Sequence, residues 1–121
     1  MAFTPESLVD DERYQIAVDL FNRQQWYAAH DAFEELWYEA HGTDRALLHG
    51  IIQISVAEYH LECGNLRGST LLMAEGLNHL YSAEPQSVDF NISDLQTTVA
   101  KRLSALQSGI SIVDQPLPCL R

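Results

Sequence analysis

The sequence predicts an all-α fold, a compact antiparallel bundle of about five helices built from stacked helical hairpins. Three observations predict it. Apolar residues recur at helical spacing in segment after segment, with short breaks rich in glycine, asparagine and threonine between them. One segment, residues 44–63, is apolar nearly all round, which is typical of a helix in the middle of a bundle. A weak internal echo at an offset of about 40 residues, between residues 25–40 and 65–80, favours hairpin stacking of the tetratricopeptide kind.

The first two helices are predicted at residues 10–23 and 26–40. The first carries an apolar stripe at i, i+3, i+4 and i+7, formed by Tyr14, Ala17, Val18 and Phe21. The second has one face of mostly large apolar side chains that includes a histidine: Trp26, Ala29, His30, Phe33, Leu36, Trp37 and Ala40. Asp31, Glu35 and Glu39 fall on its outward face.

The third helix is predicted at residues 44–63. Gly42 is a suitable stop for the helix before it, and Thr43-Asp44 is a suitable N-cap. The β-branched run at residues 50–56 is compatible with a buried strand by propensity, but the apolar pattern continues for about twenty residues and therefore favours a helix.

The fourth helix is predicted at residues 66–81, after a stop at Gly64 and a cap at Asn65. Gly68 and Gly76 interrupt it at a cost of roughly 1 kcal/mol each relative to alanine. We expect close approach to a neighbouring helix in return.

A loop is expected at residues 82–92, and the capping-box pattern at residues 93–96 opens a fifth helix that ends near residue 107. The tail, residues 108–121, contains Pro116 and Pro118 and cannot continue that helix, so it is either an extended strap over the bundle or frayed. The N-terminal lead-in is expected to hold a short turn at Thr4-Pro5-Glu6. The whole of 1–121 is expected to be one domain with its core in residues 10–107.

Composition excludes several classes of partner. The formal net charge is −10 and the seven basic residues are scattered, so a nucleic acid or an anionic membrane surface would be repelled. The N-terminus has no basic start and no apolar signal region, and no apolar run reaches the length of about 18 residues that spans a bilayer. Two cysteines, with Cys63 expected to be a buried thiol, fit a reducing compartment. We therefore expect a cytoplasmic protein with a protein, metal or small-molecule partner, and the chain is compatible with a homodimer.

One candidate site stands out. His30, Glu34 and Trp37 share a face of the second helix, and His49, Gln53 and His60 share a face of the third. If the two faces meet, the polar members of both sets converge in a partly buried pocket.

The chemistry of such a pocket leaves several alternatives open. Two imidazoles and a carboxylate form a common open site for a divalent transition metal, so His30, Glu34 and His60 are candidate ligands. A carboxylate beside a histidine also suits general acid–base catalysis. In the architectural alternative, Glu34 orients His30 while Gln53 and His60 bridge helices. The spacing lacks the HExxH arrangement of zinc hydrolases, so it indicates no particular reaction.

The aromatic residues Trp26, Tyr27, Trp37 and Tyr38 are expected to pack in the core and at its rim, with a partner-binding aromatic surface as the alternative. The acids Asp31, Glu35 and Glu39 are expected to form a solvated face.

The strings AHDAFEELW, HGIIQISVAEYH and GNLRG resemble a family of small all-helical proteins, domain-of-unknown-function family 309. The family pattern falls on three groups of residues: Ala29, His30, Glu34 and Trp37; Gly50, Gln53, Ala57 and His60; and Gly64, Asn65 and Gly68. The chain has Asp31 where the family usually has glutamate, and Ser69 where it usually has alanine. The resemblance covers about residues 15–80 and implies an all-helical fold without an established activity.

Two hypotheses follow from the residues. In the first, the protein is a helical binding or interaction module whose His/Glu/Gln cluster is chiefly architectural. In the second, it is a metal-dependent enzyme, most simply a hydrolase, with His30, Glu34 and His60 as ligands and His49 or Gln53 orienting the substrate.

Overall fold

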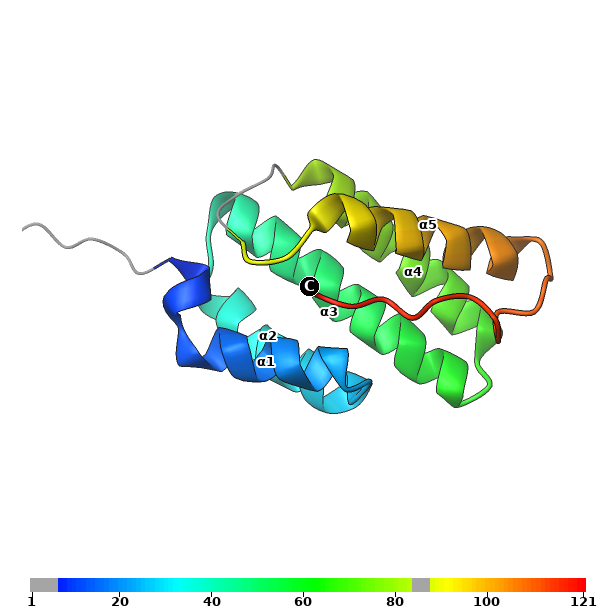
Figure 1. The fold of residues 1–121 in the computed structure, drawn as a ribbon, viewed down its shortest axis with the longest axis horizontal. Helices are drawn as coiled ribbons and strands as arrows, with labels where there is room; N and C mark the ends of the chain where they lie inside the picture. The colour runs from blue at the N-terminus through cyan, green and yellow to red at the C-terminus, as the bar shows by residue number, and fades with distance from the viewer. Residues whose placement is uncertain (1–6, 84–87) are drawn as a thin grey trace, which may run out of the picture.

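The computed structural model describes residues 7–83 and 88–121. The chain begins with a short 3₁₀ helix, η1 (Leu8–Asp10), and continues through five α-helices: α1 (Glu12–Asn22), α2 (Trp26–Glu39), α3 (Gly42–Glu62), α4 (Leu66–Ser82) and α5 (Ile92–Gln107). No strand occurs within the described ranges. The predicted all-α bundle is confirmed, and its helices pack against their neighbours along the chain (Figure 1).

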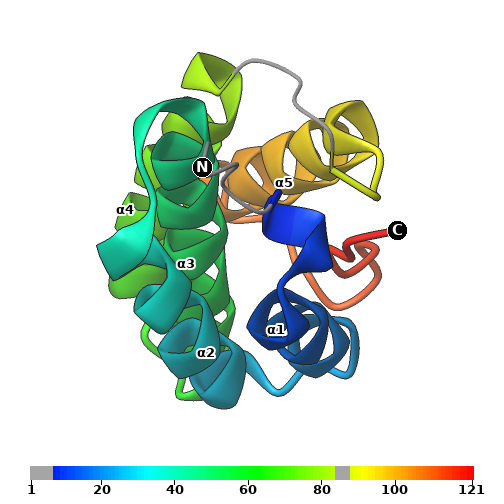
Figure 2. The same ribbon diagram turned by 90° about the vertical axis from the view of Figure 1, so that its left-hand side faces the viewer.

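The helices form two layers. Figure 2 shows α2, α3 and α4 side by side in one layer, with α1 and α5 in the other. The C-terminal residues 110–121, which we call the strap, turn at residues 113–115 and then run over α3 between α1 and α5 (Figure 1). The nearly all-apolar α3 therefore lies in the middle of the molecule, as its sequence predicts.

The core is built from the predicted stripes. Tyr14, Ala17, Val18 and Phe21 of α1 are all buried. The Phe21 ring meets the Trp26 ring edge-on, with 5.0 Å between centroids. Edge-to-face pairs of this kind stabilise a core beyond their area of burial, so α1 and α2 are fixed as a hairpin.

Close approach explains one of the two glycines inside α4. A Cβ placed on Gly76 would lie 2.7 Å from Cδ1 of Ile54 and 3.1 Å from the carbonyl oxygen of Gly50. The backbones of α3 and α4 thus pass close to each other at Gly50 and Gly76. The expectation is wrong for Gly68, whose N–H instead donates to the capping Oδ1 of Asn65 at 2.9 Å.

Two predicted helix starts are also wrong. Helix α3 begins at Gly42, which has a φ of +60°, rather than after a Thr43-Asp44 cap, and the preceding His41 makes no side-chain cap. Helix α5 begins at Ile92 because Oδ1 of Asn91 accepts the N–H of Asp94 at 3.0 Å, which displaces the predicted capping box at residues 93–96. The predicted turn at residues 4–6 and part of the predicted loop lie outside the described residues.

Hydrogen bonds tie the strap to the end of α1 and to the start of α5. Asn22, at the end of α1, both donates to the carbonyl of Leu120 (3.2 Å) and accepts its N–H (2.7 Å). The N–H of Asn91 donates to the carbonyl of Arg121 at 2.9 Å. Pro118 and Leu120 are buried against the bundle.

Among the described helices, none combines the length and apolarity needed to cross a bilayer.

Candidate functional site

The predicted site residues lie on the α2–α3–α4 layer, where they form separate groups. His30 and Glu34 make the first group, with 3.0 Å between Nε2 of His30 and Oε2 of Glu34. The hydroxyl of Tyr38 donates to the other carboxylate oxygen of Glu34 at 3.3 Å. The Nδ1 atom of His30 is buried and has no hydrogen-bond partner among the described residues, although Oδ1 of Asp31 lies 3.1 Å away.

Gln53 and His79 are the centre of the second group. Oε1 of Gln53 lies 2.6 Å from Nδ1 of His79, and Nε2 of Gln53 donates to Oε2 of Glu75 at 2.9 Å. The carbonyl of Glu75 also lies 3.0 Å from the same Nδ1. Because both of these oxygens only accept, the Nδ1 of His79 carries the proton. The group therefore joins α3 to α4 through a donor and an acceptor on one carboxamide.

His49 packs against this second group. Its ring lies 4.1 Å from the ring of His79, centroid to centroid. Burial lowers the pKa of His49 below its ordinary value, and the neighbouring His79 and Arg45 lower it further, while Glu75 opposes them. His49 is consequently held in its neutral form near physiological pH.

Trp37 connects the two groups. Its ring lies 5.5 Å from that of His49, and the guanidinium of Arg45 sits 3.9 Å from the centre of the indole. A pocket of about 190 Å³ opens beside it, lined by Glu34, Trp37, Tyr38, His49 and Ile52. We call this the inner hollow.

His60 lies apart from the other predicted residues. Its Nδ1 is 3.5 Å from Nδ2 of Asn65, at the turn into α4. The preceding residue, Tyr59, faces α2 and packs against Tyr27. Because successive residues of a helix are about 100° apart around its axis, His60 faces another direction. No three His, Cys, Asp or Glu side chains in residues 7–83 and 88–121 are placed to hold a metal ion together. The pocket predicted to unite His30, Glu34 and His60 is therefore not formed by these residues.

A second hollow lies at the start of α2. Tyr27 and Tyr59 pack together with 5.3 Å between ring centroids, and their side chains are 56% and 36% exposed. They border a pocket of about 530 Å³ lined by Gln24, Gln25, Trp26, Tyr27, Ala28, Asp31, Tyr59 and Glu62. We call it the outer hollow, and its lining contains two carboxylates and no basic side chain.

The two hollows share one edge of α2. Tyr27, Asp31, Glu34 and Tyr38 are spaced at i, i+4, i+7 and i+11, so they form one stripe along the helix. We call these four residues the aromatic–acidic stripe. The spacing is visible in the sequence, although Asp31 was predicted to lie on a solvated face with Glu35 and Glu39.

A buried ion pair between α3 and α5 was not predicted from the sequence. Arg102 donates from Nε and Nη2 to the two carboxylate oxygens of Glu58, with 2.7 Å between Nε and Oε2, and both residues are about 2% exposed. Burial raises the pKa of the Glu58 carboxyl, and the guanidinium of Arg102 opposes this rise. In each helix, one charged residue occupies a core position of the apolar stripe. This feature of the sequence could have indicated the pair.

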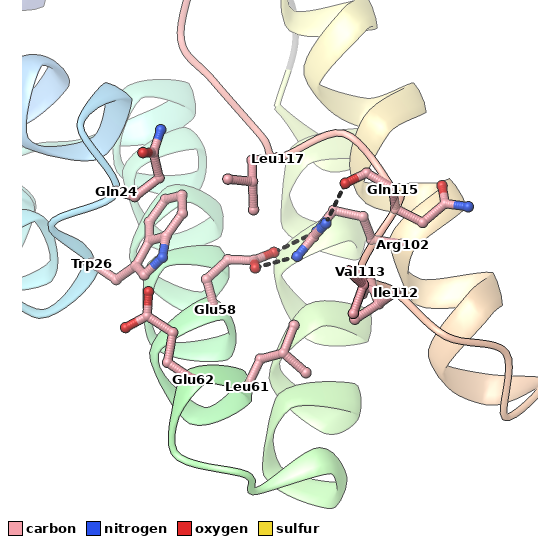
Figure 3. Close-up of a pocket in the computed structure, with 10 residues that line it drawn as sticks. All are labelled: Gln24, Trp26, Glu58, Leu61, Glu62, Arg102, Ile112, Val113, Gln115 and Leu117. Carbon is pink, nitrogen blue, oxygen red and sulfur yellow. Dashed lines mark hydrogen bonds and ion pairs between the residues drawn. The ribbon is translucent and has the colours of Figure 1, made fainter.

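The ion pair borders a third pocket, of about 410 Å³. Figure 3 shows Glu58 and Arg102 between Trp26 on one side and the strap on the other. The Nη1 atom of Arg102 donates to the carbonyls of Gln115 and Pro116, both at 3.2 Å. We call this pocket the strap cavity.

Cys63 and Cys119 are free and exposed, so the prediction that Cys63 is buried is wrong.

Comparison with protein families places part of the chain. A family model described as "Domain of unknown function (DUF309)" matches residues 14–72, from α1 into the first turns of α4. The predicted family resemblance is thereby confirmed. No curated protein matches the chain. All six predicted site residues lie inside the matched region, whereas Glu75, His79 and Arg102 lie beyond it.

Proposed function

Residues 14–72 belong to the DUF309 family, whose description names no activity, and from the geometry we propose that the protein is a binding module for a positively charged segment of a partner protein. The binding surface is the aromatic–acidic stripe of α2 together with the two hollows beside it.

The outer hollow is the observation that carries this proposal. Its two exposed tyrosine rings, Tyr27 and Tyr59, stand beside the carboxylates of Asp31 and Glu62. Aromatic faces attract ammonium and guanidinium groups by about 0.5–1 kcal/mol at exposed sites, and carboxylates add hydrogen bonds to such groups. No basic side chain in the lining competes for these partners.

The inner hollow repeats the same chemistry at the other end of the stripe. It combines the carboxylate of Glu34 with the rings of Trp37 and Tyr38. The Trp37 ring also contacts Arg45, so this indole already packs against a guanidinium. Tyr27 and Tyr38 are eleven positions apart, which is about 16 Å along a helix. A partner with two basic side chains at about that separation would fill both hollows.

The charge of the whole chain supports a basic partner. A formal net charge of −10 raises the local concentration of cationic segments and speeds their association, an effect that salt screens. The same charge argues against nucleic acid and anionic membrane surfaces. A cytoplasmic location is part of this proposal, and the two free cysteines support it.

In this proposal the His/Glu/Gln cluster is chiefly architectural. His30 holds Glu34 in place, and Gln53 with His79 fixes α3 against α4. The alternative of a metal-dependent hydrolase has no observation in its favour, since its three expected ligands do not form one group.

Binding to a defined peptide tests the proposal. The probe is a blocked peptide with two arginines separated by four glycine or serine residues, which spans about 16 Å when extended. Its control has citrulline, the neutral analogue, in place of both arginines. Titrations followed by ¹⁵N NMR should show saturable shifts along α2 for the arginine peptide, weakening as salt is added.

Substitutions should assign the binding to the stripe. Asp31→Asn and Glu34→Gln should each weaken binding several-fold, whereas Glu35→Gln, an exposed acid outside both hollows, should not. Equal binding of the citrulline peptide, or unchanged affinity in both stripe variants, would contradict the proposal.

A further inference from the structure

The outer hollow adjoins the strap cavity. Gln24, Trp26 and Glu62 line both pockets, so a segment bound in one of them lies next to the other.

The two adjoining pockets differ in chemistry. The outer hollow holds Asp31, Glu62 and the tyrosine rings. Four of the ten residues that line the strap cavity are aliphatic: Leu61, Ile112, Val113 and Leu117. Two of these are well exposed, Val113 by 85% and Leu117 by 47%. Aliphatic side chains left in water around a cavity are available for burial by a partner.

The polar groups at the base of the strap cavity are already engaged. Glu58 and Arg102 neutralise each other, and Nη1 of Arg102 is occupied by two strap carbonyls (Figure 3). The ion pair therefore fixes the strap as an apolar wall and adds no net charge to the cavity. The only other charged side chain in the lining is Glu62, on the side of the outer hollow.

We infer that the partner segment carries a basic side chain for the outer hollow followed or preceded closely by aliphatic side chains for the strap cavity. This inference rests on the proposed function and names the pattern that the binding module recognises, a basic–aliphatic segment of another protein. A second copy of this acidic chain is disfavoured as the occupant because two molecules of net charge −10 repel each other.

Three blocked peptides test the pattern. The first has one arginine and two adjacent leucines, the second has two serines in place of the leucines, and the third has citrulline in place of the arginine. The number of residues between the basic position and the pair is varied from one to four. In at least one spacing, the arginine–leucine peptide should bind at least tenfold more tightly than either of the other two.

A pair of variants should locate the aliphatic contact. In Val113→Ser/Leu117→Ser the arginine–leucine and arginine–serine peptides should bind equally, because the aliphatic wall is lost. Both positions are exposed, so the fold should tolerate the change. Ile110→Ser is the matched control, since Ile110 is also an exposed aliphatic residue of the strap but does not line the cavity, and it should keep the preference.

The outcomes separate this inference from the proposed function. If neither single-arginine peptide binds but the two-arginine peptide does, the binding module stands and the basic–aliphatic pattern is wrong. If the two-arginine peptide also fails to bind, both proposals are wrong. If the two arginine peptides bind equally to the wild type and Asp31→Asn weakens both, the binding module stands and the basic–aliphatic pattern is wrong. Sedimentation measures whether a second copy covers the cavity. A wild-type dimer that becomes a monomer in Val113→Ser/Leu117→Ser would show that it does, and this result would overturn the inference.

Discussion

The carboxamide of Gln53 holds His79 in a single tautomer across the α3–α4 interface, with 2.6 Å between Oε1 and Nδ1. The same side chain donates to Glu75 one helical turn earlier on α4. A single buried glutamine thus sets the register between two helices that pass close to each other at Gly50 and Gly76.

Loss of this contact should appear as a coupling energy. Gln53→Ala and His79→Ala should each reduce the free energy of unfolding by about 1–3 kcal/mol, because each leaves a polar group without its partner. The double variant should lose about 0.5–1.5 kcal/mol less than the sum. Urea denaturation of the four proteins measures the cycle, and strict additivity would show that the two side chains do not interact.

Acid should destabilise the bundle through His49. Its pKa in the folded protein lies below the ordinary value of 6.5, so between these two values the unfolded chain binds more protons than the folded one. The unfolding free energy should therefore fall as the pH is lowered through 6.5 toward the folded pKa. The charged or titratable groups facing His49 are His79 and Glu75 on α4, Glu34 on α2 and Arg45 on its own helix.

Denaturation at pH 5.5 and 7.5 measures this dependence. His49→Asn should reduce the difference in stability between the two pH values, whereas His41→Asn, at an exposed position, should leave it unchanged. A His49→Asn protein that keeps the full difference would assign the effect to another group.

Removing one partner of the buried ion pair should lower the free energy of unfolding strongly, whereas replacing both partners by apolar residues should lower it much less. Arg102→Met leaves Glu58 buried without its partner and should lower the unfolding free energy by about 3–5 kcal/mol. Glu58→Met/Arg102→Met should lose much less, because no charge is then left unpaired. Lys101→Met, at the exposed neighbouring position, should change stability by less than about 0.5 kcal/mol. A double variant as unstable as Arg102→Met would show that the strap contacts dominate.

The pairing of His30 with Glu34 should be structural. His30→Ala should cost about 1–3 kcal/mol of unfolding free energy, since it empties a half-buried position and leaves Glu34 without its nearest partner. Thermal melts with and without added Zn²⁺ should show the same loss. A melting shift caused by Zn²⁺ in the wild type and absent from the variant would instead support the metal-dependent alternative.

Close backbone packing should make Gly50 intolerant of a methyl group. A Cβ at this position would lie 3.0 Å from the carbonyl oxygen of Gly76 and 3.0 Å from Cδ2 of Leu80. Gly50→Ala should therefore lose about 1–2 kcal/mol even after the gain in helix propensity. Asn78→Ala, on the exposed side of α4, controls for propensity alone and should be neutral or slightly stabilising. A stabilised Gly50→Ala would mean that α3 and α4 separate easily.

The fold was predictable because it rests on local patterns. The spacing of Tyr14, Ala17, Val18 and Phe21 encodes the buried face of α1 without any knowledge of its partners. The same holds for the pairing of His30 with Glu34, since residues four apart on a helix are neighbours wherever the helix lies.

The rest of the site depends on how helices are rotated against one another. His60 shares a stripe with His49 and Gln53 in sequence, yet at its end of α3 it turns toward Asn65 instead of α2. Gln53 contacts His79 on α4, which lies 26 positions away in the sequence. Arg102 pairs with Glu58, which lies 44 positions earlier in the sequence, and no local pattern relates the two residues.

The hydrogen bonds between Asn22 and Leu120 join residues 98 positions apart, whereas the α1–α2 and α3–α4 hairpins close over short turns. Contacts that close long loops carry the larger entropic cost and form late in folding. The order of assembly should therefore be hairpins first and strap last. The strap should also be the first part to detach in the native state, so the amide of Leu120 should exchange with solvent sooner than those in the middle of α3.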